Sequence, residues 1–299
     1  MASLSAQPVS SAAVGLDHEA TAKGSRSPSR SSSVSSSGKQ NPANLPYRPF
    51  PTSMELYANW DISKPRTWHI RETGSRVRLF AIQHHSGLSG RGPLSTAPGI
   101  YIYNGPNESD GILAAIGDES LESARVLAFN SNSVIMLPPV EPTGTNRFTN
   151  TKMVPRSSKE HGAIFQFTIE SGYDWRKKVF EWRKLAKGDE DYAGAGGYKL
   201  VALPRRTNRE DATQSESRSS SAPADDGETV AVLTFISLLK TFTHAFSLRL
   251  VGNAAKGVYG DRCVLAIVLT AVRLLMLRMK GRASQTVVKT GEKIHGKPE

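Results

Sequence analysis

Cysteine is almost absent from this chain: Cys263 stands alone among 299 residues, so no intramolecular disulfide can form. Residues 1–24 also lack the basic start and the apolar run of a secretory signal. We therefore expect an intracellular protein, either cytoplasmic, peripheral to a membrane, or nuclear. Aromatic residues make up only 7% of the chain and hydrophobic residues 38%, so part of the sequence must lie outside any core.

Motifs of catalytic, metal and nucleotide sites are missing as well. The glycines at positions 87, 90 and 92 have the wrong spacing for a phosphate-binding loop, and no helix is expected after them. His84 and His85 are adjacent, so on a strand they would point to opposite faces and could not readily bind one metal. No nucleophile elbow is present. We expect no enzymatic activity, no cofactor and no metal.

Three segments are too polar to contribute to a core. Residues 1–45 are rich in Ser, Ala, Pro and Gly, residues 204–228 are rich in Ser, Asp, Glu and Arg, and residues 282–299 form a polar basic tail. Such segments bury too little apolar surface to offset the entropy lost on ordering. We predict that all three are disordered, the second as a loop insert, and that one domain covers residues 46–281.

Within that domain, short runs of β-branched and aromatic residues alternate with Gly, Pro, Asn and Asp, which is typical of an all-β protein. The pattern predicts about a dozen strands. They fall within residues 54–60, 67–71, 76–84, 99–103, 112–116, 124–129, 133–137, 163–170, 178–184, 198–203, 229–235 and 245–251.

One segment, residues 261–280, is predicted to form a helix that is apolar on every side. Between Cys263 and Leu277, only Thr270 and Arg273 are polar. A surface helix has one apolar stripe and one polar face. This helix must therefore be surrounded by lipid or by the rest of the protein. Gly281 is expected to cap its C-terminal end.

Closing the strands around this helix would satisfy both patterns, because a closed sheet has no exposed edges and cans of about eleven strands can hold a central helix. We predict a mainly β fold, a closed antiparallel barrel of about twelve strands that encloses a hydrophobic C-terminal α-helix. The alternative is a membrane anchor formed by residues 261–280. Arg273 argues against the anchor because it limits the charge-free stretch to about ten residues.

The formal net charge of +11 favours acidic partners such as phosphate, anionic lipid or nucleic acid. Candidate anion- or lipid-binding residues lie around Phe180 and Trp182 and at the end of the apolar helix. They are Arg176, Lys177, Lys178, Arg183, Lys184, Arg278, Lys280 and Arg282. Strand alternation puts Glu181 and Arg183 on one face and Phe180 and Trp182 on the other, with Trp182 in the core. The structural alternatives are a solvated hairpin and cations that complement the helix dipole.

Several strand and turn motifs carry a family resemblance. They are Met54-Glu55-Leu56-Tyr57-Ala58-Asn59-Trp60, Ile102-Tyr103-Asn104-Gly105-Pro106, Phe180-Glu181-Trp182-Arg183, Gly196-Gly197-Tyr198-Lys199-Leu200-Val201 and residues 252–261. Through them the chain resembles the tubby C-terminal-like superfamily, which includes LURP-one-related proteins and phospholipid scramblases. It looks most like uncharacterised tubby-like proteins of filamentous fungi. The resemblance covers residues 46–281, interrupted by the insert at residues 205–227. It implies a barrel around a hydrophobic helix, and phosphoinositide binding or lipid handling.

Two functions are expected from these observations. The first is a non-enzymatic binding or interaction module, acting as a monomer, whose partner is the headgroups of anionic membrane lipids or another protein. The second is a membrane-anchored, scramblase-like protein that handles lipid and uses residues 261–280 as its anchor. Nucleic-acid binding ranks last, because the strands lack the aromatic and basic signature of the common RNA-binding modules.

Overall fold

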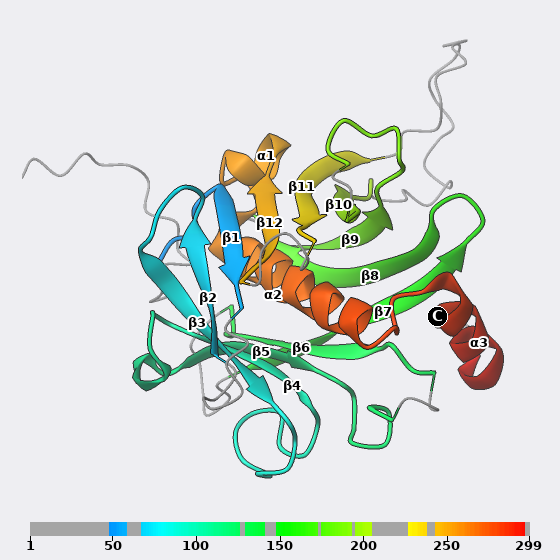
Figure 1. Cartoon of the computed structure of the whole chain (residues 1–299), viewed down its shortest axis with the longest axis horizontal. Coiled ribbons are helices and arrows are strands. Elements are labelled where there is room, and N and C mark those ends of the chain that lie inside the picture. The colour runs from blue at the N-terminus through cyan, green and yellow to red at the C-terminus, as the bar shows by residue number, and fades with distance from the viewer. Residues whose placement is uncertain are drawn as a thin grey trace, which may run out of the picture. The chain divides into compact units, whose positions relative to one another are not determined.

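Each strand of the sheet pairs with its neighbours in the chain, and the last strand pairs with the first, so the sheet closes into an antiparallel barrel (Figure 1). The computed structural model describes residues 48–58, 67–125, 129–140, 148–172, 175–192, 195–204, 227–237 and 243–296. The described residues form twelve strands: β1 (Ser53–Tyr57), β2 (Thr67–Glu72), β3 (Arg78–His85), β4 (Gly99–Tyr103), β5 (Ile112–Gly117), β6 (Ser133–Leu137), β7 (Thr149–Ser158), β8 (Gly162–Ser171), β9 (Arg176–Lys184), β10 (Gly197–Ala202), β11 (Glu228–Phe235) and β12 (His244–Leu250).

A helix fills the lumen of the barrel. The helices of the described part are the 3-10 turn η1 (Glu108–Asp110) and the α-helices α1 (Gly252–Ala255), α2 (Gly260–Met279) and α3 (Gln285–His295). Every residue of α2 from Arg262 to Leu277 is buried, and the helix runs through the barrel in Figure 1. The predicted barrel around a hydrophobic helix is therefore confirmed. The structure places α2 among the strands, whereas the anchor alternative requires it to lie in lipid.

Within the described part of the chain, no helix combines the length and the apolar character that crossing a bilayer demands.

The C-terminal end of α2 has the glycine cap that the sequence predicts. Gly281 has a φ of 69°. Its N–H donates to the Arg278 carbonyl at 3.0 Å, and the Arg282 N–H donates to the Leu277 carbonyl at 2.7 Å. These two bonds define a Schellman motif. Because the motif reverses the chain, it brings Arg282 back toward the end of the barrel.

Two strand predictions are wrong. The predicted strand 124–129 does not form, because Ala124 and Arg125 lie in a turn and Phe129 has a φ of 46°, which is incompatible with extended backbone. Residues 126–128 lie outside the described residues. The pattern also misses β7, in which Pro155 should interrupt a ladder. Pairing with β6 ends at Met153, so Pro155 lies beyond β6, where its missing N–H does not break the β6–β7 ladder.

The C-terminal tail is a further correction. Residues 282–299 were expected to be disordered, but α3 forms there and packs against β7 and β8. The Ser284 hydroxyl caps the helix by accepting the Val287 N–H at 3.3 Å, and Val288 is buried. Composition misses this helix because specific contacts hold it, including a 2.8 Å bond from the Ser157 N–H to the Glu292 carboxylate.

The other two predicted disordered segments cannot be compared in full with the structure. The predicted tail 1–45 lies outside the described residues, and so do residues 205–226 of the predicted insert. Glu228, which was assigned to that insert, begins β11.

Gly291 sets how closely α3 approaches the barrel. A Cβ at this position would overlap the carbonyl oxygen of Phe129. We expect Gly291→Ala to release α3 while the barrel stays folded. Hydrogen exchange should then show lost protection in residues 285–295 and retained protection in the strands. Lys289→Ala, on the exposed side of the same helix, is the matched control and should keep α3 protected. Equal protection in both variants would contradict the prediction.

Candidate functional site

The interior of the barrel is occupied by side chains, so the candidate binding groups lie at its ends. Trp182 shows how the lumen is filled: it is fully buried, and its indole Nε1–H donates to the Thr270 hydroxyl at 2.9 Å. That hydroxyl in turn donates to the Ala266 carbonyl at 2.8 Å. The prediction that Trp182 belongs to the core is confirmed.

We name the two ends of the barrel by the helices that lie there. The α1 end carries the start of α2, the turns around residues 73–77 and 251–259, and the described residues Gly172 and Trp175 between β8 and β9. The α3 end carries the end of α2 and residues 86–98, 118–125 and 185–192. Because the strands alternate in direction around the barrel, each odd-numbered strand runs from the α1 end to the α3 end.

The structure divides the predicted anion-binding residues between these ends. Arg176, Lys177 and Lys178 begin β9 at the α1 end. Arg176 and Lys177 are exposed, whereas the Lys178 ammonium lies 4.4 Å from the centroid of the Tyr259 ring. Lys184 ends β9 at the α3 end, where Arg278, Lys280 and Arg282 also lie.

Arg183 belongs to neither group of accessible cations. Its Nε donates to the Glu181 carboxylate at 2.7 Å, and both side chains are buried. The alternation that placed Glu181 and Arg183 on one face and Phe180 and Trp182 on the other is confirmed. Arg183 therefore neutralises a carboxylate of its own strand, which leaves it poorly placed to bind an external anion.

A buried carboxylate, Asp118, organises the α3 end. It accepts from Arg273 at 2.5 Å and from Arg282 at 2.8 Å, both bonds reaching Oδ1. Arg273 also donates from Nε to the Ser133 hydroxyl at 2.8 Å. Arg282 is therefore an internal partner of Asp118 and is buried. Nothing in the sequence indicates this cluster, because Asp118 and Arg273 are 155 positions apart.

Positive charge exceeds negative charge around Asp118. Burial lowers the pKa of the Arg273 guanidinium, while the Asp118 carboxylate raises it. The pKa of the Lys280 ammonium is also lowered, chiefly by desolvation. The Asp118 carboxylate raises this pKa, whereas the Arg273 and Arg282 guanidiniums lower it. Lys280 as a residue is exposed. Arg278, also exposed, lies with its guanidinium 4.6 Å from the centroid of the Phe235 ring. The α3 end thus combines a buried cluster of one carboxylate and two guanidiniums with two solvent-facing cations.

At the α1 end, two carboxylates are held by local donors. Glu228 accepts from the Asn253 N–H at 2.6 Å and from the Tyr259 hydroxyl at 2.7 Å. Burial raises the pKa of Glu228, but these hydrogen bonds outweigh it, and the net pKa is lowered. Glu170 pairs with Arg262 at 3.3 Å. Arg262 therefore offsets the charge of Glu170, whereas the neutral donors around Glu228 stabilise its negative charge.

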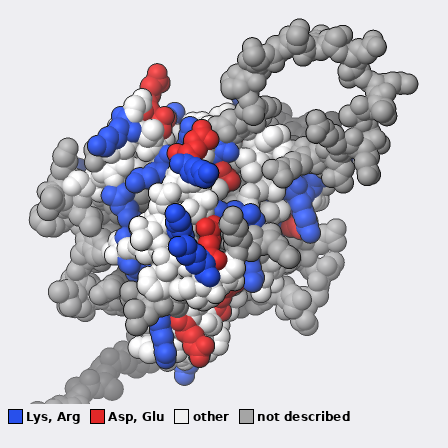
Figure 2. Space-filling model, turned by 90° about the vertical axis from the view of Figure 1, so that its right-hand side faces the viewer, with Lys and Arg blue, Asp and Glu red and all other residues white. Residues whose placement is uncertain are grey.

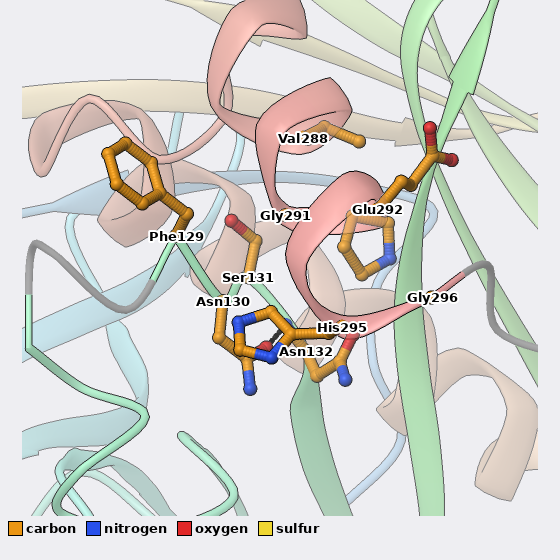
Figure 3. A pocket seen from close by; sticks show the side chains of 10 residues that line it. Phe129, Asn130, Ser131, Asn132, Val288, Gly291, Glu292, His295 and Gly296 are labelled. Atoms are coloured by element: carbon orange, nitrogen blue, oxygen red, sulfur yellow. Dashed lines mark hydrogen bonds between the residues drawn. The ribbon is translucent and has the colours of Figure 1, made fainter.

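A small pocket of about 160 Å³ lies between α3 and the barrel (Figure 3). Its lining includes Asn130 and Asn132, whose amides donate to the Glu119 carboxylate at 3.3 and 3.2 Å. Its Glu292 is bonded to the Ser157 N–H. The Glu292 bond thus holds α3 against β7, whereas the two amides hold Glu119. Among the residues that the structure describes, no three His, Cys, Asp or Glu side chains form a group that could hold a metal ion.

The fold and these two ends define a closed antiparallel β-barrel that is filled by its own helix and carries cations at both mouths. Comparison with protein-family models, with curated proteins and with solved structures finds no match to this chain. The resemblance to the tubby C-terminal-like superfamily therefore stays a prediction.

Proposed function

We propose that this protein is a non-enzymatic β-barrel module that binds anionic phospholipid surfaces, including those that contain phosphoinositides. The observation that carries the proposal is the placement of its cations. Of the predicted set, Arg183 and Arg282 are buried, and the others reach solvent at the two ends of the barrel. Figure 2 shows Lys and Arg side chains over the face that carries α3, with Asp and Glu beside them.

Surface contact fits this architecture better than lipid carriage. Buried side chains of α2 and of the strands pack together in the lumen, where a lipid carrier would hold an acyl chain. Each Lys or Arg close to an anionic bilayer contributes about 1 kcal/mol, so several must act together. Their attraction falls off within a Debye length of about 8–10 Å at physiological salt. Binding of this kind is therefore sensitive to lipid charge and to ionic strength.

Vesicle flotation tests the proposal. We expect the full chain to float with vesicles of phosphatidylcholine mixed with phosphatidylserine or phosphatidylinositol bisphosphate, and to dissociate at high salt because exposed charges are then screened. Vesicles of phosphatidylcholine alone are the control and should leave the protein at the bottom of the gradient. The absence of salt-sensitive flotation with either anionic vesicle would overturn the proposed function.

A further inference from the structure

Two turns at the α1 end expose an apolar side chain beside cations. In the turn between β2 and β3, Val77 is 64% exposed and lies between the exposed Arg76 and Arg78. In the turn that leads into α2, Val258 is 44% exposed and follows the exposed Lys256 by two positions. An exposed valine alone needs no explanation, but two that project from neighbouring turns among cations form a defined surface.

Both turns project into solvent. Gly74 has a φ of 78° and Gly257 a φ of 74°, backbone conformations that glycine adopts without strain. A Cβ built at either position would meet no atom within 4 Å. Both turns therefore have open space around their glycines, and the exposure of the two valines leaves them accessible to a flat surface.

A third turn of the same end presents an aromatic ring. Trp175, between β8 and β9, is half-buried and is followed by the exposed Arg176 and Lys177. Its φ of 51° is unusual for a bulky residue. The left-handed conformation costs about 1–2 kcal/mol for a residue with a side chain. Such strain concentrates at functional sites, and tryptophan is enriched where membranes meet water.

These three turns lie on one continuous rim. The start of β1 accepts N–H bonds from Thr73 at 3.1 Å and from Leu250 at 2.7 Å, so it links the β2–β3 turn to the end of β12. α1 follows β12 directly, and Figure 1 shows β1, β12 and α1 side by side. The Gly172 N–H donates to the Tyr259 carbonyl at 3.0 Å, which joins the β8–β9 turn to the segment that enters α2.

Several carboxylates of this end are engaged by local donors. Glu108 accepts from the Thr67 hydroxyl at 2.8 Å and from the Gln83 amide at 2.9 Å. Asp110 accepts the Asn107 N–H at 2.8 Å. Glu170 pairs with Arg262, and Glu228 accepts from Asn253 and Tyr259. These carboxylates keep their negative charge, as do Glu72 and Asp261, but none of them lies within residues 76–78, 175–177 or 256–258.

The α3 end also exposes apolar side chains, since Leu88 is 87%, Ile294 is 58% and Met279 is 45% exposed, and Met279 lies between the exposed Arg278 and Lys280. Exposed carboxylates accompany them, at Glu122, Glu160 and Glu190. The mixture of charges is visible on the α3 face in Figure 2. An anionic surface would be repelled by these acids as well as attracted by the lysines and arginines.

We infer that the α1 rim, formed by residues 76–78, 175–177 and 256–258, is the face that docks on an anionic bilayer. Val77, Val258 and Trp175 enter the headgroup region, and the flanking cations contact lipid phosphates. Apolar insertion and electrostatic attraction add in such interfacial binding. The inference rests on the proposed function and specifies the orientation of the barrel on the membrane.

Matched pairs of exposed substitutions test the orientation in the full chain. The charge pair compares Arg76→Glu/Arg78→Glu on the rim with Lys289→Glu/Lys293→Glu on α3, which changes the net charge equally. The apolar pair compares Val77→Ser/Val258→Ser with Leu88→Ser/Met279→Ser. With phosphatidylcholine–phosphatidylserine vesicles, we expect each rim variant to weaken binding at least about tenfold and each α3-end variant to stay within about threefold. Thermal unfolding of each variant verifies that it is folded.

Trp175 provides a second readout. Trp68 and Trp182 are buried in the barrel and should respond little to vesicles. Because Trp60 is the fourth tryptophan of the chain, the measurement uses a Trp60→Phe background. In that background we expect a blue shift of tryptophan fluorescence on binding, and we expect Trp175→Phe to abolish it. Two outcomes are kept apart by this design. If the wild-type chain ignores anionic vesicles, the proposed function fails. If it binds but rim and α3-end variants weaken equally, or the α3-end variants alone weaken, the orientation is overturned and the function stands. Binding of a soluble inositol phosphate without vesicle binding would also overturn the docking rim.

Discussion

Asp118→Asn is expected to lower the free energy of unfolding by about 3–5 kcal/mol, the cost of leaving a buried charge without its partner. The Asp118 side chain is fully buried, and those of Arg273 and Arg282 are only 1% and 3% exposed. Replacing the carboxylate by an amide leaves two desolvated guanidiniums facing each other. The amide oxygen can still accept one hydrogen bond, but it cannot offset their charge.

Urea unfolding measures this loss, and two variants calibrate it. Glu119→Gln breaks a pair in which the Lys152 side chain is 64% exposed, so we expect a loss of less than about 1 kcal/mol. Adding Arg273→Met to Asp118→Asn removes one of the orphaned charges and should restore part of the stability, because apolar replacement of buried ions is often neutral or stabilising. An Asp118→Asn loss as small as that of Glu119→Gln would mean that water reaches the cluster.

The strand pattern was sufficient to predict the barrel because local stop signals divide the sequence clearly. β4 and β6 have the bounds that were predicted for them, residues 99–103 and 133–137. The first is followed by an Asn-Gly-Pro turn and the second by two prolines, and neither sequence extends a ladder. The helix was predictable because apolar side chains surround it on all sides, which only an enclosing wall can satisfy in water.

The features that escaped prediction depend on contacts between distant residues. β7 is polar, and it forms because β6 and β8 flank it within a closed sheet. α3 holds through a glycine that fits against Phe129. In the Asp118 cluster, Asp118 directly follows β5, Arg273 precedes the C-terminal cap of α2, and Arg282 follows that cap. In each case the local sequence does not indicate the element or the contact, because the residues that stabilise it are distant in the chain and are brought close only by the tertiary fold.

The candidate site was also hard to predict, because the sequence does not show which of its residues the fold brings together. Lys178 and Lys184 are close in sequence, yet six residues of strand at about 3.3 Å each separate them by about 20 Å. They lie at opposite ends of the barrel and cannot contact one phosphate group together. The exposed valines and the positive φ of Trp175 carry no sequence signal as a group, because strand order alone brings their turns to one rim.

Trp182→Ala is expected to destabilise the protein by about 3–5 kcal/mol, because it opens a cavity between β9 and α2 that rigid neighbours cannot close. Trp182 is fully buried, and its indole bonds to Thr270 of α2 at 2.9 Å. Thr270→Ala removes that hydrogen bond with a much smaller change in volume, and should lose about 1 kcal/mol.

Urea unfolding of these two variants and of Trp175→Ala separates the contributions. Trp175 lies half-buried in a turn and leaves no enclosed cavity when truncated, so its loss should be well below that of Trp182→Ala. If the two tryptophan variants lose the same stability, β9 is not packed against α2 in solution. The enclosed helix, on which the filled lumen and the surface-binding proposal both depend, would then be wrong.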